Sequence, residues 1–245
     1  NPLEIYPQLR NIFSSKNKVK IIEFGCGSGW LVNSLAYHLA DNIEIIGVDF
    51  NPVVIEYAEE IKSRLKVKST FVVSDLFTYE SEEKYDLIIS LGVLHHTNNC
   101  LAALNYIMSF GSLKSHIFLG LYHKYGRKPF LDYFKNLDEK SDEDKFYEYK
   151  KFHKIKDEKK IYSWFRDQVL HPHETQHSLS EILPIFIENN YKVYKTSLNK
   201  FQKIKSISDI VKQEKKWYNY GVEKIKKYQY FPGFFITIGK KNLNI

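Results

Sequence analysis

The 245-residue sequence predicts an α/β domain built on a mostly parallel sheet, and three observations support this fold class. Short runs of β-branched and aliphatic residues alternate with amphipathic stretches through the first half of the chain. Glycines and an Asn-Pro pair mark points where strands turn into helices. The same alternation resumes near the C-terminus. Strands that alternate with helices form right-handed crossovers, which cover both faces of the sheet with helices.

The first half contains the predicted strands Lys20–Phe24, Glu44–Val48, Phe71–Val73, Asp86–Ser90 and Ile117–Tyr122. Each is a short apolar run, the pattern of a strand buried on both faces. Helices are predicted between them over Trp30–Leu39, residues 51–65 and Leu101–Met108. The second helix has the clearest start, because Asn51 suits the N-cap and Pro52 the first helical position.

Two insertions interrupt this alternation. Residues 123–177 are aromatic and charged, with a helix predicted over Asp142–Lys159, and residues 198–230 are rich in lysine. We predict one domain, residues 1–245, in which both insertions are lids. The predicted core comprises residues 19–121, 178–197 and 231–241.

The core resumes between the insertions with one helix. Ser178 and Glu181 have the spacing of a capping box at its start, and Pro184 is expected to bend it. The strands Lys192–Thr196 and Phe234–Ile238 follow. The sheet is therefore expected to be completed by segments far apart in the chain.

Composition excludes several classes of protein. Hydrophobic residues make up 43% of the chain, enough for a substantial core and too many for a disordered protein. Two cysteines cannot form a disulfide framework or a four-thiolate zinc site. The sequence shows no membrane-length apolar run and no secretory pattern, so we expect a cytoplasmic protein without a membrane partner. Because the first residue is Asn1, we expect further residues before it.

The net charge of +7 suggests a nucleic-acid partner, but its distribution weakens that interpretation. Only four of the 36 basic residues are Arg, the residue suited to bidentate base and phosphate contacts. Residues 192–241 carry a net charge of +10, whereas residues 1–191 carry −3. We therefore interpret the basic segment, residues 192–241, as a solvated face or a surface for acidic partners. Nucleic acid is not favoured as a partner.

A glycine-rich turn after the first strand is the strongest functional signal. Gly25, Gly27 and Gly29 permit positive φ angles and close approach of a ligand, and the next helix offers free N–H groups to an anionic group. Asp49 ends the second strand, where a carboxylate can accept hydrogen bonds from ribose hydroxyls. The spacing G-x-G-x-G places Trp30 where a dinucleotide fingerprint has its third glycine, which disfavours NAD and FAD.

Four segments, in order along the chain, resemble the motifs of the class I S-adenosylmethionine-dependent methyltransferases. They are Glu23–Gly29, Gly47–Pro52, Val73–Phe77 and Tyr85–His96. The resemblance covers about residues 19–121 and returns at 178–197 and 232–240. It implies a Rossmann-like, mostly parallel seven-stranded sheet with an antiparallel final strand. It also implies S-adenosylmethionine as cofactor and S-adenosylhomocysteine as product.

The same resemblance implies roles for individual residues. The glycines would pack against the methionine moiety, Asp49 would bind the ribose hydroxyls, Phe50 would lie against adenine, and Asp75 would accept from the adenine amino group. The complete cofactor-binding set is Glu23, Gly25, Cys26, Gly27, Gly29, Asp49, Phe50, Asp75, Leu76 and Leu91.

Histidines gather at two places on the predicted substrate side. His95 and His96 follow the fourth strand, and the cluster 171–177 ends the first insertion. This cluster, together with residues 167–170 and 120–127, loosely resembles a poorly characterised bacterial subgroup of these enzymes. Three interpretations stay open for the cluster: a metal site, a substrate or catalytic site, and a purely structural role. We predict His96, His173, Glu174 and His177 as catalytic, and His95, Tyr122, Tyr125, Arg166 and His171 as substrate-binding. No residue is assigned to a metal, which is possible but not favoured.

The predicted function is methyl transfer to a small-molecule or natural-product acceptor, with His as general base under the lid. One alternative is an RNA methyltransferase that uses the lysine-rich segment, although residues 90–93 lack the Asn/Asp-Pro-Pro-aromatic turn of exocyclic-amine enzymes. A second is a metal-assisted methyltransferase that uses the histidine cluster. A third is a non-catalytic cofactor-binding module with an aromatic interface at residues 217–231. The oligomeric state is not predicted.

Overall fold

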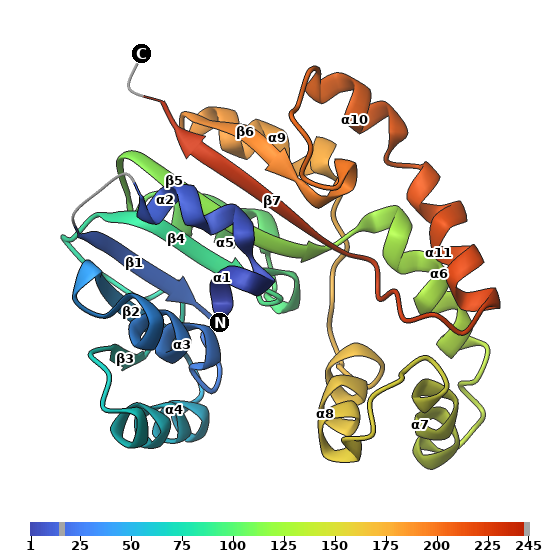
Figure 1. Ribbon diagram of the computed structural model, residues 1–245. Coiled ribbons are helices and arrows are strands. Elements are labelled where there is room, and N and C mark those ends of the chain that lie inside the picture. Colours follow the sequence, from blue (N-terminus) through green and yellow to red (C-terminus); the bar gives the residue numbers. More distant parts are fainter. Residues whose placement is uncertain (15–17, 243–245) are drawn as a thin grey trace.

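The computed structural model describes residues 1–14 and 18–242. Within these residues, seven strands form one sheet in the order β3-β2-β1-β4-β5-β7-β6 (Figure 1). β7 runs antiparallel to both of its neighbours, and the other pairs are parallel. The strands are β1 Val19–Phe24, β2 Ile43–Asp49, β3 Thr70–Val73, β4 Tyr85–Leu91, β5 Gly111–Tyr122, β6 Tyr191–Thr196 and β7 Phe234–Lys241. The predicted fold class, including the antiparallel final strand, is confirmed.

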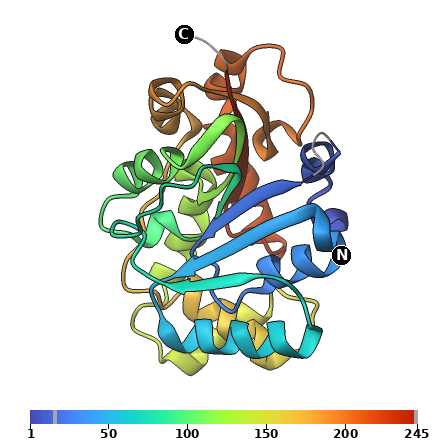
Figure 2. The same cartoon turned by 90° about the vertical axis from the view of Figure 1, so that its left-hand side faces the viewer.

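Helices cover both faces of the sheet because successive strand residues point to opposite sides. Ile21 packs into a core with the helices before β3, whereas Ile22 packs into a second core with the later helices. The first layer contains α1 Pro2–Ile5, α2 Arg10–Phe13, α3 Trp30–Leu39 and α4 Pro52–Leu65, and the second contains α5 Cys100–Met108 and α9 Leu179–Glu188. Figure 2 shows the sheet between these layers. Short 3₁₀ segments lie at Pro7–Leu9, Ala40–Asn42, Leu94–His96 and Ser197–Asn199.

The first insertion forms a small aromatic core of its own, apart from the sheet (Figure 1). It contains α6 Lys124–Lys135, α7 Asp142–Lys150 and α8 Glu158–Gln168. The prediction of one helix over Asp142–Lys159 is wrong, because residues 151–157 separate two helices. Asp157 caps α8 by accepting a hydrogen bond from the Lys160 amide, which fixes a new helix start there.

The second insertion contains two helices that the sequence did not predict, α10 Ile207–Gln213 and α11 Lys216–Lys226. α11 packs against α6, with Gly221 directly over Pro129. Between α10 and α11, the buried Glu214 accepts hydrogen bonds from the Leu179 and Ser180 amides at the start of α9. A carboxylate is favourable at a helix N-terminus, so Glu214 anchors the insertion to the core.

The predicted capping box at the start of α9 is confirmed. Ser178 accepts from the Glu181 amide, and the Glu181 carboxylate accepts from the Ser178 amide. Pro184 lies inside the helix, which is continuous from Leu179 to Glu188. No helix in the described part of the chain is long and apolar enough to cross a membrane.

Candidate active site

The glycine turn after β1 has the backbone that its sequence predicts. Gly25, Gly27 and Gly29 have φ angles of +73°, +51° and +70°. A Cβ atom on Gly25 would lie 2.3 Å from Val93 Cγ2, and one on Gly29 would lie 2.6 Å from Phe71 Cζ. A Cβ on Gly27 would meet no atom within 4 Å. The outer glycines therefore permit close packing, while the middle one adjoins open space that a ligand can enter.

Asp49 connects this turn to the end of β2. Its Oδ2 accepts from the Gly27 amide at 2.9 Å, and its Oδ1 accepts from the Asn51 amide at 3.0 Å. Each carboxylate oxygen retains a second lone pair, so Asp49 can also accept hydrogen bonds from a ligand. Asp49 thereby fixes the turn that it would share with the cofactor.

Glu23 lies buried at the end of β1, with 6% of its surface exposed. Burial, and then the nearby charge of Asp49, raises the pKa of Glu23 to about 8. Within residues 1–14 and 18–242, its Oε2 atom has no hydrogen-bond partner. A buried oxygen without a partner is costly, and a donor group on a bound ligand would satisfy it. This acidic residue therefore fits the amino end of a ligand such as S-adenosylmethionine.

A cavity of about 290 Å³ opens at the carboxyl ends of the strands. Phe50 is 74% exposed, which leaves a ring face available to a planar group. Half of the residues that line the cavity belong to the predicted set: Gly25, Asp49, Phe50, Asp75, Leu76 and His96. The other lining residues were not predicted, although each lies within two positions of a predicted one: Val48, Ser74, Phe77, Val93, Thr97 and Asn98.

Other predicted cofactor residues lie around the cavity without lining it. The Cys26 thiol is buried, and burial raises its pKa well above the ordinary value, which makes it a packing group rather than a nucleophile. Leu91 is half-buried at the end of β4. Asp75, by contrast, lines the cavity, and its Oδ1 accepts from the Phe77 amide at 2.8 Å.

His95 is fully buried beside the cavity, and its ring lies 4.2 Å from the Tyr122 ring between centroids. Neither ring nitrogen has a hydrogen-bond partner in the described residues. Burial, followed by the charges of His96 and Arg127, lowers the pKa of His95 to about 2. His95 is therefore a neutral, packed ring near neutral pH.

His96 lines the cavity and has a defined tautomer. Its Nδ1 lies 2.9 Å from the backbone oxygen of His173, and since that oxygen only accepts, Nδ1 carries the proton. Nε2 therefore keeps a free lone pair, and this nitrogen lies 3.7 Å from Asp167 Oδ1. Burial is the largest of several influences that together lower the pKa of His96. A neutral imidazole with a basic Nε2 is the form a general base requires.

The histidine loop, residues 171–177, folds against this edge of the cavity. The His171 ring lies 3.9 Å from the His96 ring, and His173 Nε2 lies 3.2 Å from the Thr97 backbone oxygen. The His177 amide donates to the Tyr122 backbone oxygen at 2.9 Å, which joins the loop to the end of β5. His177 Nε2 lies 2.9 Å from Thr175 Oγ1, and burial lowers the pKa of His177.

Glu174 is held by a residue that the sequence analysis did not assign. The fully buried Arg127 donates through Nε to Glu174 Oε1 at 2.9 Å and through Nη2 to Oε2 at 2.6 Å. Its guanidinium carbon also lies 3.9 Å from the Tyr122 ring centroid. Both carboxylate oxygens of Glu174 are thus engaged. A signal for Arg127 existed, since arginine is rare in this lysine-rich chain.

The remaining predicted residues lie further from the cavity. Tyr125 is half-buried, with its ring 5.8 Å from that of His123. Arg166 is exposed on α8. Across the described ranges, no group of three or more His, Cys, Asp or Glu side chains could hold a metal ion. The metal-assisted alternative therefore gains no support from the geometry.

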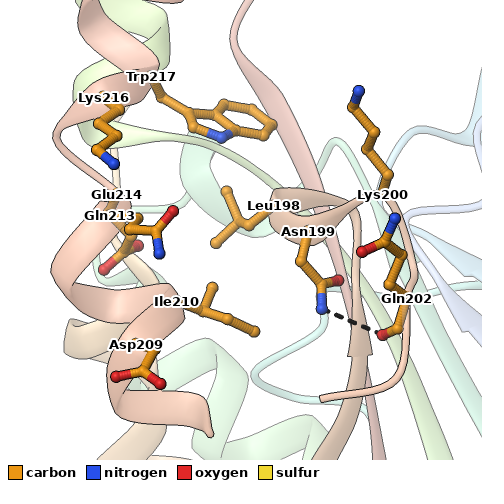
Figure 3. A pocket seen from close by; sticks show the side chains of 10 residues that line it. All are labelled: Leu198, Asn199, Lys200, Gln202, Asp209, Ile210, Gln213, Glu214, Lys216 and Trp217. Carbon is orange, nitrogen blue, oxygen red and sulfur yellow. Dashed lines mark hydrogen bonds between the residues drawn. The ribbon is translucent and has the colours of Figure 1, made fainter. Parts of the chain in front are cut away.

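A separate hollow of about 440 Å³ lies between residues 198–202 and the helices α10 and α11 (Figure 3). Leu198, Ile210 and Trp217 face it from three segments, surrounded by polar side chains. None of the predicted site residues lines this hollow.

Comparison with known proteins gives one family. The model of a family described as "Methyltransferase domain" matches residues 15–220. The malonyl-[acyl-carrier protein] O-methyltransferase of Acetivibrio thermocellus is 33% identical over 101 residues, which is 41% of this chain and 34% of that protein. The enzyme of the same name from Bacillus cereus is 28% identical over 166 residues, 66% of this chain and 56% of that protein. The chain thus spans about a third to just over half of these curated relatives.

Solved structures share the fold at low identity. Magnesium protoporphyrin IX methyltransferase from Synechocystis PCC 6803, with bound SAH, has a TM-score of 0.61 at 16% identity. The match covers 98% of this chain and 81% of that protein's chain. PKMT2 from Rickettsia typhi in complex with AdoHcy has a TM-score of 0.65 at 15% identity. The match covers 93% of this chain and 49% of the PKMT2 chain.

Proposed function

Since this chain belongs to the class I S-adenosylmethionine-dependent methyltransferases, we propose that it transfers the cofactor's methyl group to an oxygen atom of a small-molecule acceptor. The family prediction made from the sequence motifs is confirmed at this level. One observation supports the proposal most: four residues at the carboxyl ends of three strands line a single cavity, namely Gly25, Asp49, Phe50 and Asp75. Oxygen is proposed because the Acetivibrio thermocellus and Bacillus cereus relatives are named O-methyltransferases.

The cavity residues and the nearby Glu23 contact different parts of the cofactor in this proposal. Asp49 accepts hydrogen bonds from the ribose hydroxyls, and Phe50 packs against adenine. Asp75 accepts a hydrogen bond from the adenine amino group. Glu23 accepts from the amino end through its unpartnered Oε2. When bound, S-adenosylmethionine supplies an electrophilic methyl group on a positively charged sulfur. The protein's contribution is to orient that group and to keep water from it.

His96 is the proposed base. It lines the cofactor cavity, and its neutral Nε2 can take the proton of an acceptor hydroxyl as the new bond to carbon forms. This nitrogen is buried under the histidine loop, so the His171 ring must move aside when an acceptor enters. We further propose that the first insertion, residues 123–177, is the lid over the acceptor, since its histidine loop contacts both His96 and Thr97.

Four lysines of the basic segment are poorly placed to hold RNA near this site. Lys192, Lys195, Lys203 and Lys205 line a hollow beside β6, with Tyr191 and Asn190 from the start of that strand. Because β6 runs parallel to β5, its start lies at the end of the sheet opposite the cofactor cavity. These four lysines therefore give no support to an RNA acceptor at the cofactor cavity.

Calorimetric titration with S-adenosylhomocysteine tests the cofactor assignment directly. We expect saturable one-to-one binding, and its absence would refute the proposed function. Transfer of a tritiated methyl group from S-adenosylmethionine to hydroxylated small molecules then tests the reaction. Acceptance of RNA as the better methyl acceptor in the same assay would replace the small-molecule proposal.

A further inference from the structure

Another hollow, of about 610 Å³ and called the second hollow below, adjoins the candidate active site through the neighbours of His96. One wall is a stripe of α8 that presents Lys159, Tyr162, Ser163 and Arg166. These positions are three or four residues apart, so they share one face of the helix. His171 and Asp167 line the side nearest His96.

Contacts through His96 join the cofactor cavity to the second hollow. The imidazole of His96 lines the cofactor cavity. The His171 ring lies 3.9 Å from the His96 ring, and Asp167 Oδ1 lies 3.7 Å from His96 Nε2. Both of these neighbours line the second hollow. A molecule in this hollow would therefore have one end beside the proposed base, as an acceptor requires.

The α8 wall carries two cations without a fixed counter-charge. Arg166 and Lys159 are exposed, and within residues 1–14 and 18–242 neither makes a salt bridge or a side-chain hydrogen bond. The one carboxylate of the hollow, on Asp167, already accepts from the Tyr122 hydroxyl at 3.4 Å and lies beside His96. A free guanidinium with a lysine on the same helix face matches the two oxygens of a carboxylate or phosphate.

We propose that the second hollow is the acceptor site and that it selects acceptors bearing an anionic group, a carboxylate or a phosphate, held by Arg166 and Lys159. This inference rests on the proposed function. The acceptor's hydroxyl, distant from its anionic group, lies against His96. Its O–H proton passes to His96 Nε2, the oxygen forms the new bond to the methyl carbon, and the carbon–sulfur bond breaks with its electron pair staying on sulfur.

Three related phenols test the charge preference: 4-hydroxyphenylacetate, 4-hydroxybenzylphosphonate and the neutral 4-hydroxyphenylacetamide. Their binding is measured by calorimetry on the full chain saturated with S-adenosylhomocysteine. We expect at least one anionic phenol to bind ten-fold or more tightly than the amide. The stronger of the two anions identifies whether the site prefers carboxylate or phosphate.

Two variants of α8 form a matched pair. Arg166→Gln is expected to weaken binding of the preferred anion ten-fold or more and to leave the amide unchanged. Lys160→Gln removes the same charge from the same helix, but its amine lies over the Trp164 ring, 5.2 Å from the centroid, and does not line the hollow. It should leave all three affinities unchanged.

The inference is overturned if the anions bind no better than the amide, if none of the three phenols binds, or if Lys160→Gln weakens the anion as much as Arg166→Gln. Each of these results can occur with normal S-adenosylhomocysteine binding, in which case only the acceptor site is refuted. Loss of S-adenosylhomocysteine binding by the unmodified protein would instead refute the proposed function.

Discussion

Arg127 and Glu174 form a bidentate ion pair across 47 residues of sequence, between α6 and the histidine loop. The same guanidinium donates to the backbone oxygens of Gln168 and Pro232. One buried side chain thus joins the end of α8, the histidine loop and the lead into β7. Arg127 therefore acts as a positioning residue for the loop that covers His96.

Removal of either partner of this pair should destabilise the protein strongly. Breaking a buried ion pair leaves an uncompensated charge, so Arg127→Met or Glu174→Gln should each lower the free energy of unfolding by about 3–5 kcal/mol. The double variant Arg127→Met/Glu174→Gln should lose less than the sum of the two single variants. Urea unfolding measures all three. As a control, Arg64→Ala, which breaks an exposed pair with Glu60, should change the same quantity by about 0–1 kcal/mol. Additive losses would contradict the coupling.

Substitution of Asp49 should abolish cofactor binding. Asp49→Ala removes the acceptor of the Gly27 and Asn51 amides and the proposed ribose contacts. Two charged hydrogen bonds contribute about 1.5–3 kcal/mol each, so affinity for S-adenosylhomocysteine should fall by about 100-fold or more. Asp41→Ala, at an exposed carboxylate paired with Lys68, is the calorimetric control and should bind normally. Near-normal affinity of the Asp49 variant would remove this residue from the site.

The glycines of the turn should differ in their tolerance of a methyl group. Gly25→Ala combines the strain of positive φ with a clash against Val93, for an expected loss of about 2–5 kcal/mol in the free energy of unfolding. Gly27→Ala adds only the backbone strain, about 1–2 kcal/mol. Denaturant titration of both variants compares them. Equal losses would mean that the packing against Val93 is not what restricts Gly25.

Glu23 should make stability depend on pH. The pKa of Glu23 is about 8 in the folded protein and near 4.5 in the unfolded chain, so the native state stays protonated to a higher pH. Stability from this group is complete below pH 4.5 and is lost as pH rises through 8, with a slope of up to about 1.4 kcal/mol per pH unit. Glu23→Gln keeps a neutral side chain and lacks this loss. The difference between the two unfolding curves should therefore grow from pH 5 to pH 8, and a constant difference would contradict the buried, protonated state.

Substitution of His96 should separate catalysis from binding. With an acceptor found in the transfer assay, His96→Gln should lower kcat by about 10²- to 10⁴-fold, the usual contribution of a general base. Because the pKa of His96 is lowered, the rate of the unmodified protein should decline only below the ordinary histidine range, and the variant should lack this acid limb. An unchanged pH profile would exclude His96 as the base, whatever the size of the rate loss.

Local pattern was sufficient to predict most of the sheet and half of the residues that line the cavity. β1, β2 and the glycine turn after β1 carry apolar runs, glycines and Asp49 within one short segment, so their placement follows from neighbouring residues. The structure of the two insertions depended on contacts between distant residues. Glu214 is an ordinary acidic residue in a lysine-rich stretch, and its burial follows only from its place at the start of α9. Arg127 and Glu174 likewise acquire their roles from pairing across the fold.

The position of β7 also bears on the order in which the molecule can be made. This strand lies between β5 and β6, yet it is the last to leave the ribosome. Until Phe234–Lys241 emerges, β5 and β6 each present an unpaired edge, and such edges recruit other chains. The lysines that precede and flank β7 would keep nascent chains apart during this interval.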